Sequence, residues 1–195
     1  MSRPEARPKL SRPHILEAAL RLIDREGTEA LSMRKLGTEL GVEAMSLYRH
    51  VANKEAVLDG VVELLISKLG IPASSMQPWQ EDVRRVADTY RYLARSHPRA
   101  FPLLALRPFT TPQAVEQERA ILDLFRKAGF EEQAAHFAFR AFGSFTAGHL
   151  LEEVMLAPAD EELERWEAAF AFGICVLLSG LQAQLSSSKE KSDIC

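Results

Sequence analysis

The sequence predicts an all-α protein, and three observations support that prediction. Apolar residues recur at helical spacing through nearly the whole chain, whereas Val, Ile and Thr are too scattered to form the alternating runs typical of strands. Gly or Pro interrupts the periodic stretches where helices would end. Apolar residues make up 47% and charged residues 26% of the 195 positions, which is ordinary for a globular protein and excludes a disordered chain.

Four helices are predicted in the first part of the chain, with Ser11, Ser32 and Asn53 as N-caps for the first, second and fourth. Their expected ranges are 12–27, 33–41, 44–50 and 53–70. The fourth of these helices is expected to connect an N-terminal domain, residues 1–54, to the rest of the chain.

A second domain, residues 71–185, is predicted after the linker-like stretch 71–78 (IPASSMQP), which combines Pro and Ser with no charge. Five helices are expected there: 79–96, a short one within 98–108, 113–128, 131–156 and 161–185. Residues 186–195 are expected to form a disordered polar tail.

The charge is distributed unevenly along the chain. The total is 24 Lys plus Arg against 27 Asp plus Glu, a net charge of −3. Residues 1–54 hold ten basic and seven acidic residues and carry +3, so the remaining residues carry −6. A small basic module joined to an acidic body is compatible with a nucleic-acid partner for the module.

Several other classes of protein are disfavoured. Cys175 and Cys195 match no metal or redox spacing and are expected to be one core and one tail thiol. The N-terminus has no apolar signal segment, and the apolar stretch 168–181 is shorter than the roughly 20 residues that span a bilayer. We therefore expect no membrane association, no metal and no cofactor, and a cytoplasmic location.

The segment 36–51 (LGTELGVEAMSLYRHV) has the spacing of a helix-turn-helix motif. Gly41 suits the tight turn, and the apolar residues between Leu36 and Val51 would hold two short helices together. The outer face of the second helix is then Ala44, Met45, Ser46, Tyr48, Arg49 and His50. These side chains could contact bases and phosphates of DNA. The alternative is a generic helical hairpin with a solvated Arg/His surface.

The run 15–59 closely resembles the DNA-binding domain of tetracycline-repressor-family regulators, through its LGV…LYRHVANKEAVLD pattern. The resemblance implies that Arg34 contacts double-stranded DNA, that Met45, Ser46, Tyr48 and His50 face the groove, and that Lys54 grips a phosphate. Lys54 also lies in the first turn of a helix, where exposed N–H groups favour a phosphate. Arg3, Arg7 and Lys9 form either a DNA-reaching arm or a disordered terminus.

The remainder resembles, more weakly, the ligand-binding half of the same family, at Ser96-His97, Arg107-Pro108, 128–130 and 142–153. The resemblance implies a sensor domain that changes the separation of two DNA-reading heads in a dimer. The tetracycline receptors hold a magnesium ion with a His just before the Arg-Pro pair, where this chain has Leu103. Their Gln in the next helix falls at Ile121, although Glu152 matches their acidic residue. A metal-free, largely apolar effector is therefore expected.

A homodimer is predicted because two helices are apolar on nearly all sides and a monomer of this size would struggle to cover both. Gly173 and Gly180 would let another helix approach. The candidate interface residues are Phe145, Glu152, Trp166, Phe170, Gly173, Leu177, Gly180 and Leu181. A dimer would read a palindromic operator with half-sites about one helical turn apart. The alternative is a single well-packed monomer core.

An apolar pocket for the effector is predicted in the second domain. Its candidate residues are Trp79, Phe101, Leu103, Leu104, Phe109, Ile121, Phe125, Phe139, Phe142 and His149. The alternative for each of them is plain core, which is the more common role of an aromatic residue at helical spacing.

The sequence thus predicts a ligand-responsive transcriptional repressor. One alternative is a helical DNA-binding protein without an effector. Another is a helical enzyme using His149 and Glu152, which are three residues apart, but no second metal-binding or catalytic motif accompanies them.

Overall fold

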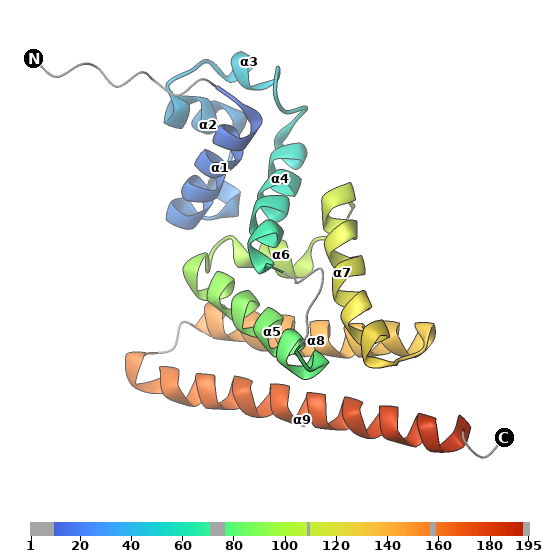
Figure 1. Ribbon diagram of the computed structural model, residues 1–195. Coiled ribbons are helices and arrows are strands. Elements are labelled where there is room, and N and C mark those ends of the chain that lie inside the picture. Colours follow the sequence, from blue (N-terminus) through green and yellow to red (C-terminus); the bar gives the residue numbers. More distant parts are fainter. Residues whose placement is uncertain (1–9, 71–76, 109, 157–158, 193–195) are drawn as a thin grey trace, which may run out of the picture. The chain divides into compact units, whose positions relative to one another are not determined.

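The computed structural model describes residues 10–70, 77–108, 110–156 and 159–192, and every regular element in these ranges is a helix (Figure 1). The predicted all-α class is confirmed. The chain divides between Leu64 and Leu65 into two compact units, which we call the N-terminal and the C-terminal unit. The division falls inside the fourth helix, which we expected to be the connector.

The helices of the N-terminal unit are α1 (Arg12–Glu26), a 3-10 turn η1 (Thr28–Ala30), α2 (Met33–Leu40), α3 (Ala44–Leu47) and α4 (Lys54–Ile66), which crosses into the next unit. Side chains cap the first turns of α1, α2 and α4. The Ser11 hydroxyl accepts from the backbone N–H of the third residue after it at 3.4 Å, and the Ser32 hydroxyl does the same at 3.2 Å. Asn53 Oδ1 accepts a 2.8 Å bond at the start of α4. Each bond satisfies an N–H that the helix itself leaves unpaired.

The C-terminal unit is built from longer helices. After a 3-10 turn η2 (Ser67–Leu69), they are α5 (Trp79–Ser96), α6 (Phe101–Leu106), α7 (Pro112–Ala128), α8 (Glu132–Leu156) and α9 (Asp160–Ser192). Helix α8 contacts each of the other four, and α5 also packs on α7 and α9. The core contains an aromatic cluster of Trp79, Phe125, Phe130 and Phe142, with neighbouring ring centroids 5.8–6.4 Å apart.

Helix α9 is longer than we predicted. We expected it to end near residue 185 and a disordered tail to follow, but the helix continues through Ser192. The Ser186 and Ser187 hydroxyls donate to carbonyls one turn earlier, at 3.2 and 3.0 Å, so the polar side chains are accommodated within the helix.

One face of α9 is apolar and open in the single chain. The side chains of Phe172 and Val176, one turn apart, are 72% and 55% exposed. By length and composition alone, the segment Glu161–Ser187 could cross a membrane, and only 22% of its apolar window is buried. The apolar part of this helix is therefore longer than the stretch 168–181 that we considered in the sequence. An exposed apolar face of this kind is typical of a surface that packs against another molecule.

Candidate functional site

The turn between α2 and α3 brings two helices unusually close together. Gly41 ends α2 with φ at +66°, a conformation that favours glycine. A Cβ on Gly37 would lie 2.8 Å from the carbonyl oxygen of Val42 and 3.1 Å from the backbone nitrogen of Ala44, so only glycine fits there. We did not identify Gly37 in the sequence; the available signal was a glycine inside a helix, where it costs about 1 kcal/mol relative to Ala.

This packing presents the outer face of the motif to solvent. Leu47 and Val51 are buried, whereas the Met45 and Tyr48 side chains are 73% and 45% exposed. Arg49 and His50 are also exposed, and Ala44 and Ser46 are half-buried. Helix α3 ends at Leu47 rather than near His50 as predicted; residues 48–50 continue as a turn closed by a 2.9 Å bond from the His50 N–H to the Leu47 carbonyl.

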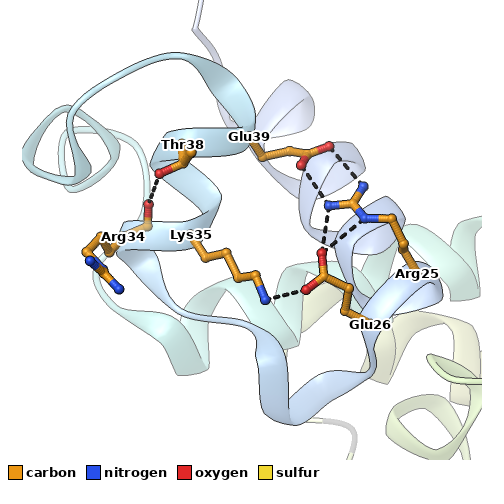
Figure 2. A network of polar contacts seen from close by, with 6 residues as sticks. All are labelled: Arg25, Glu26, Arg34, Lys35, Thr38 and Glu39. Carbon is orange, nitrogen blue, oxygen red and sulfur yellow. Dashed lines mark hydrogen bonds and ion pairs between the residues drawn. The ribbon is translucent and has the colours of Figure 1, made fainter.

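The cations in and beside the motif have no acidic partner within the described residues, whereas Arg12, Arg25 and Lys35 of the same unit each do. Among the residues that the structure describes, Arg34, Arg49 and Lys54 form no ion pair, whereas Arg12 is 2.8 Å from a Glu63 carboxylate. The Arg34 side chain points away from the cluster of ion pairs around Arg25 (Figure 2). The predicted contacts Arg34 and Lys54 thus keep positive charge available for phosphates. The arm residues Arg3, Arg7 and Lys9 lie outside the described residues.

A cavity of about 510 Å³ opens in the C-terminal unit. It is lined from α5, α6, the residues after α6, α7 and α8 by Tyr90, Leu104, Ala105, Leu106, Arg107, Pro108, Glu118, Phe139, Arg140, Gly143, Ser144 and Ala147. Burial raises the pKa of the Tyr90 hydroxyl, which therefore stays protonated and can donate a hydrogen bond into the cavity. The lining combines apolar side chains with polar ones, among them the charged Arg107, Glu118 and Arg140.

Of the predicted pocket residues that the structure describes, only Leu104 and Phe139 line this cavity. Four others belong to the core: Phe101, Ile121, Phe125 and Phe142. Trp79 packs edge-on against Phe130 in the same core, and Leu103 is half-buried outside the lining. Phe109 lies outside the described residues. Helical spacing identified the aromatic residues but could not tell which side of each helix faces the cavity.

His149 lies in a different environment from the predicted pocket. Its ring is 5.3 Å from both the Trp166 and Phe170 rings, and its Nε2 atom is buried without a hydrogen-bond partner among the described residues. Burial lowers the pKa of His149, while the nearby Glu153 carboxylate acts in the opposite direction. Together with Glu152, His149 lines a separate cavity of about 350 Å³ at the start of α9.

The two acidic neighbours of His149 differ in exposure. Glu152 is exposed, but Glu153 is buried and accepts two 3.2 Å hydrogen bonds from Arg91 of α5. Arg91 also lies over the Phe170 ring, 5.5 Å from its centroid. Within the described residues no group of three His, Cys, Asp or Glu side chains could hold a metal ion.

The predicted interface residues separate into two sets. Phe170 is buried within the chain, and Phe145 stacks on it at 6.1 Å. A Cβ on Gly173 would meet the Phe145 ring, so this glycine serves packing between α8 and α9 of one chain rather than contact with another copy. Gly180 and Glu152 are exposed, and Trp166, Leu177 and Leu181 are half-buried. Phe172 and Val176 of α9, which were not among the predicted residues, are also exposed.

Comparison with known proteins identifies the family of both units. The model of bacterial regulatory proteins of the tetR family matches residues 15–61, and the model of tetracyclin repressor-like C-terminal domains matches residues 71–168. An HTH-type transcriptional regulator of Saccharopolyspora erythraea is 31% identical over 80% of this chain and 66% of its own length.

Two further similarities extend over nearly the whole chain. Tetracycline repressor protein class E of Escherichia coli is 30% identical, over 93% of this chain and 95% of its own length. A TetR variant from Acinetobacter baumannii AYE, solved in complex with minocycline, is 26% identical with a TM-score of 0.78, and covers 91% of this chain and 99% of that one. With its exposed helix-turn-helix face and helical second unit, the chain belongs to the tetR family and is a DNA-binding transcriptional regulator, not an enzyme.

Proposed function

We propose that the protein is a cytoplasmic, homodimeric repressor that binds a palindromic operator and is released by a small effector bound in the 510 Å³ cavity. The observation that supports the DNA-binding part most directly is the outer face of the motif. There the side chains of Met45, Tyr48, Arg49 and His50 are exposed beside cations with no acidic partner. Base edges and phosphates provide the partners that these side chains lack.

The open face of α9 supports the homodimer. From Ala168 to Ser188 the sequence holds no charged residue, and Phe172 and Val176 are exposed in the single chain. A second copy covers an identical apolar face in a two-fold dimer. We therefore place Phe172, Val176 and Gly180 in the proposed interface, with Trp166, Leu177, Leu181 and Glu152 around them, and remove Phe145, Phe170 and Gly173.

The cavity supports an effector with an apolar body and at least one polar group. Leu104, Leu106 and Phe139 would contact the body, whereas the Tyr90 hydroxyl and Arg140 offer hydrogen-bond donors. At the positions matching the metal-binding and Gln residues of the tetracycline receptors, Leu103 and the buried Ile121 offer no donor, which supports a ligand other than a metal–tetracycline complex. The cavity also favours this function over a DNA-binding protein without an effector.

The effector would act by binding more tightly to one conformation of the dimer than to the other. If it favours a state in which the two recognition helices no longer match successive major grooves, the operator is released. Its effect on operator affinity is limited by the ratio of its affinities for the two states.

Two experiments test this proposal. Selection of bound DNA from a random pool, followed by footprinting, should yield a palindrome with half-sites about one helical turn apart; a non-palindromic site bound by a monomer would contradict the dimer. For the effector, the protein is heated with a metabolite library, because a ligand of the folded state raises the melting temperature. The control is Ala147→Phe, which fills the cavity. A compound that raises the melting temperature of the wild type and of Ala147→Phe equally binds elsewhere. If no compound raises the melting temperature of the wild type, the sensor function is contradicted.

A further inference from the structure

The last turn of α1 and helix α2 are joined by a network of four alternating charges (Figure 2). Arg25 donates to both oxygens of Glu39, at 2.8 and 3.3 Å, and through its Nε to Glu26 at 3.0 Å. The other oxygen of Glu26 pairs with the Lys35 ammonium. We call these residues, Arg25, Glu26, Lys35 and Glu39, the α1–α2 network.

The geometry of the α1–α2 network makes it more than a set of separate surface pairs. A two-pronged Arg–carboxylate contact fixes both the distance and the direction between the groups it joins. Hydrogen bonding from Arg25 lowers the pKa of Glu39, and the bond from Lys35 followed by that from Arg25 lowers the pKa of Glu26. Both carboxylates are therefore charged at neutral pH. Isolated exposed ion pairs contribute little, but bidentate pairs within a network are the exception.

The network gives two adjacent cations different roles. Lys35 is bound to Glu26, on the side of α2 that faces α1. The Arg34 guanidinium points away from the network, and the Arg34 carbonyl accepts a 3.0 Å bond from Thr38, one turn later in α2. A rotation of α2 about its axis would change the direction of the Arg34 side chain and would break the contacts of both Lys35 and Glu39.

We propose that Arg25 and Glu39 are positioning residues for DNA binding. Their contact fixes the rotation of α2 about its axis relative to α1. In this orientation Lys35 stays paired with Glu26 and does not contact DNA, whereas Arg34 points toward the duplex. The inference rests on the DNA-binding function, but not on the dimer or on the effector.

The variant Glu39→Gln tests this proposal, because a positioning role and a purely electrostatic role predict opposite changes in the affinity for DNA. It removes a negative charge from the DNA-binding unit, so if the network supplied only charge, binding to DNA would become tighter. If the network positions α2, the variant should weaken binding to the selected operator about fivefold, on the order of what one exposed ion pair in a network contributes. Affinity is measured by fluorescence anisotropy with the operator selected from the random pool.

Glu43→Gln is the matched control. Glu43 is the N-cap residue of α3, its side chain makes no capping bond, and it has no ion pair among the described residues. The change in charge is the same, so binding should stay equal or become tighter. If Glu39→Gln binds as tightly as Glu43→Gln, the proposal is wrong. Thermal melting checks that Glu39→Gln is folded, and Glu26→Gln, which frees Lys35, should weaken binding in the same direction.

Salt dependence provides a second test that does not need the operator. In binding to mixed-sequence duplex DNA, Arg34→Ala should lower the slope of log affinity against log salt by about one unit, because one phosphate contact is lost. Lys35→Ala should leave the slope unchanged. Equal slopes for the two variants would contradict the proposal that Lys35 contacts Glu26 and not a phosphate of DNA. A protein that selects no DNA sequence would contradict the proposed function, while these slopes would still decide the roles of the two cations.

Discussion

The two units differ in how much of their apolar surface a single chain covers. In the described part of the N-terminal unit, the large apolar side chains that are strongly exposed are Met45 and Tyr48, and both lie on the DNA-binding motif. In the described part of the C-terminal unit such side chains occur on four helices, and Phe172 and Val176 form a continuous open face on α9. In the described part of the N-terminal unit, large apolar side chains are therefore strongly exposed at the binding motif alone, whereas the C-terminal unit has surfaces and a cavity that other molecules would have to fill.

The largest expected effect concerns stability of the C-terminal unit. Glu153→Gln removes the buried partner of Arg91, and we expect the free energy of unfolding to fall by about 3 kcal/mol. This is the lower end for a broken buried pair, because Glu167 remains 3.6 Å from Arg91. Denaturant unfolding measures the change. Glu152→Gln, at the exposed neighbouring position, is the control and should change stability little; equal losses for both would show that the buried pair is not the cause.

The next effect tests whether α9 is covered by a second copy. Phe172→Glu places a charge on the open apolar face and should convert the dimer to a monomer. Operator affinity should then fall about 100-fold, because two linked recognition helices bind far more tightly than one. Sedimentation and gel shifts measure the two changes. Tyr92→Glu, an equally drastic change at an exposed position on α5, should affect neither; a dimeric Phe172→Glu variant would contradict the proposed interface.

A smaller effect is expected in the N-terminal unit. Lys54→Ala should weaken binding about fivefold on specific and non-specific DNA alike and lower the salt slope by about one unit. Arg21→Ala removes the same charge from an exposed position on α1, outside the motif, and should leave the slope unchanged. If both variants behave alike, the charge of the unit matters and the position of Lys54 does not.

The smallest effect is a pH dependence in the C-terminal unit. Burial lowers the pKa of His149 below its ordinary value of 6.5, although Glu153 and Glu152 oppose the shift and Arg91 reinforces it. The unfolded chain therefore binds this proton more readily, and the folded state should lose stability as the pH falls below about 6.5. His149→Phe should remove this part of the dependence. The comparison is the difference between wild type and variant, measured by thermal melting from pH 8 to about 5; identical profiles would contradict it.

Features that depend on neighbouring residues could be predicted from the sequence, whereas contacts between distant residues could not. Helix starts at Ser11, Ser32 and Asn53 were correct, because capping depends on residues within one turn. The contact between Arg25 and Glu39 could not be predicted, because these residues are fourteen positions apart and meet only when α2 packs on α1. Local rules describe where helices begin, and packing decides which side chains meet.

Packing matters even more in the C-terminal unit. Phe170 and Phe172 are two positions apart in one apolar helix, yet the first is buried in the chain and the second is open to solvent. Similarly, Phe139 lines the cavity while Phe142 lies in the aromatic core. Apolar composition predicted that these residues would be covered. Whether the cover is the same chain, a second chain or a ligand depends on the rotation of each helix, which a sequence apolar on nearly all sides does not determine.

The open face of α9 also links regulation to the amount of protein in the cell. In the proposed dimer, a newly made chain cannot bind the operator with both recognition helices until it meets a second copy. At low abundance, the concentration of dimers rises with the square of the concentration of chains. Doubling synthesis would then increase the DNA-binding species about fourfold, by mass action. The same apolar stripe that makes α9 look like a membrane helix would thereby set a threshold of abundance for silencing the target gene.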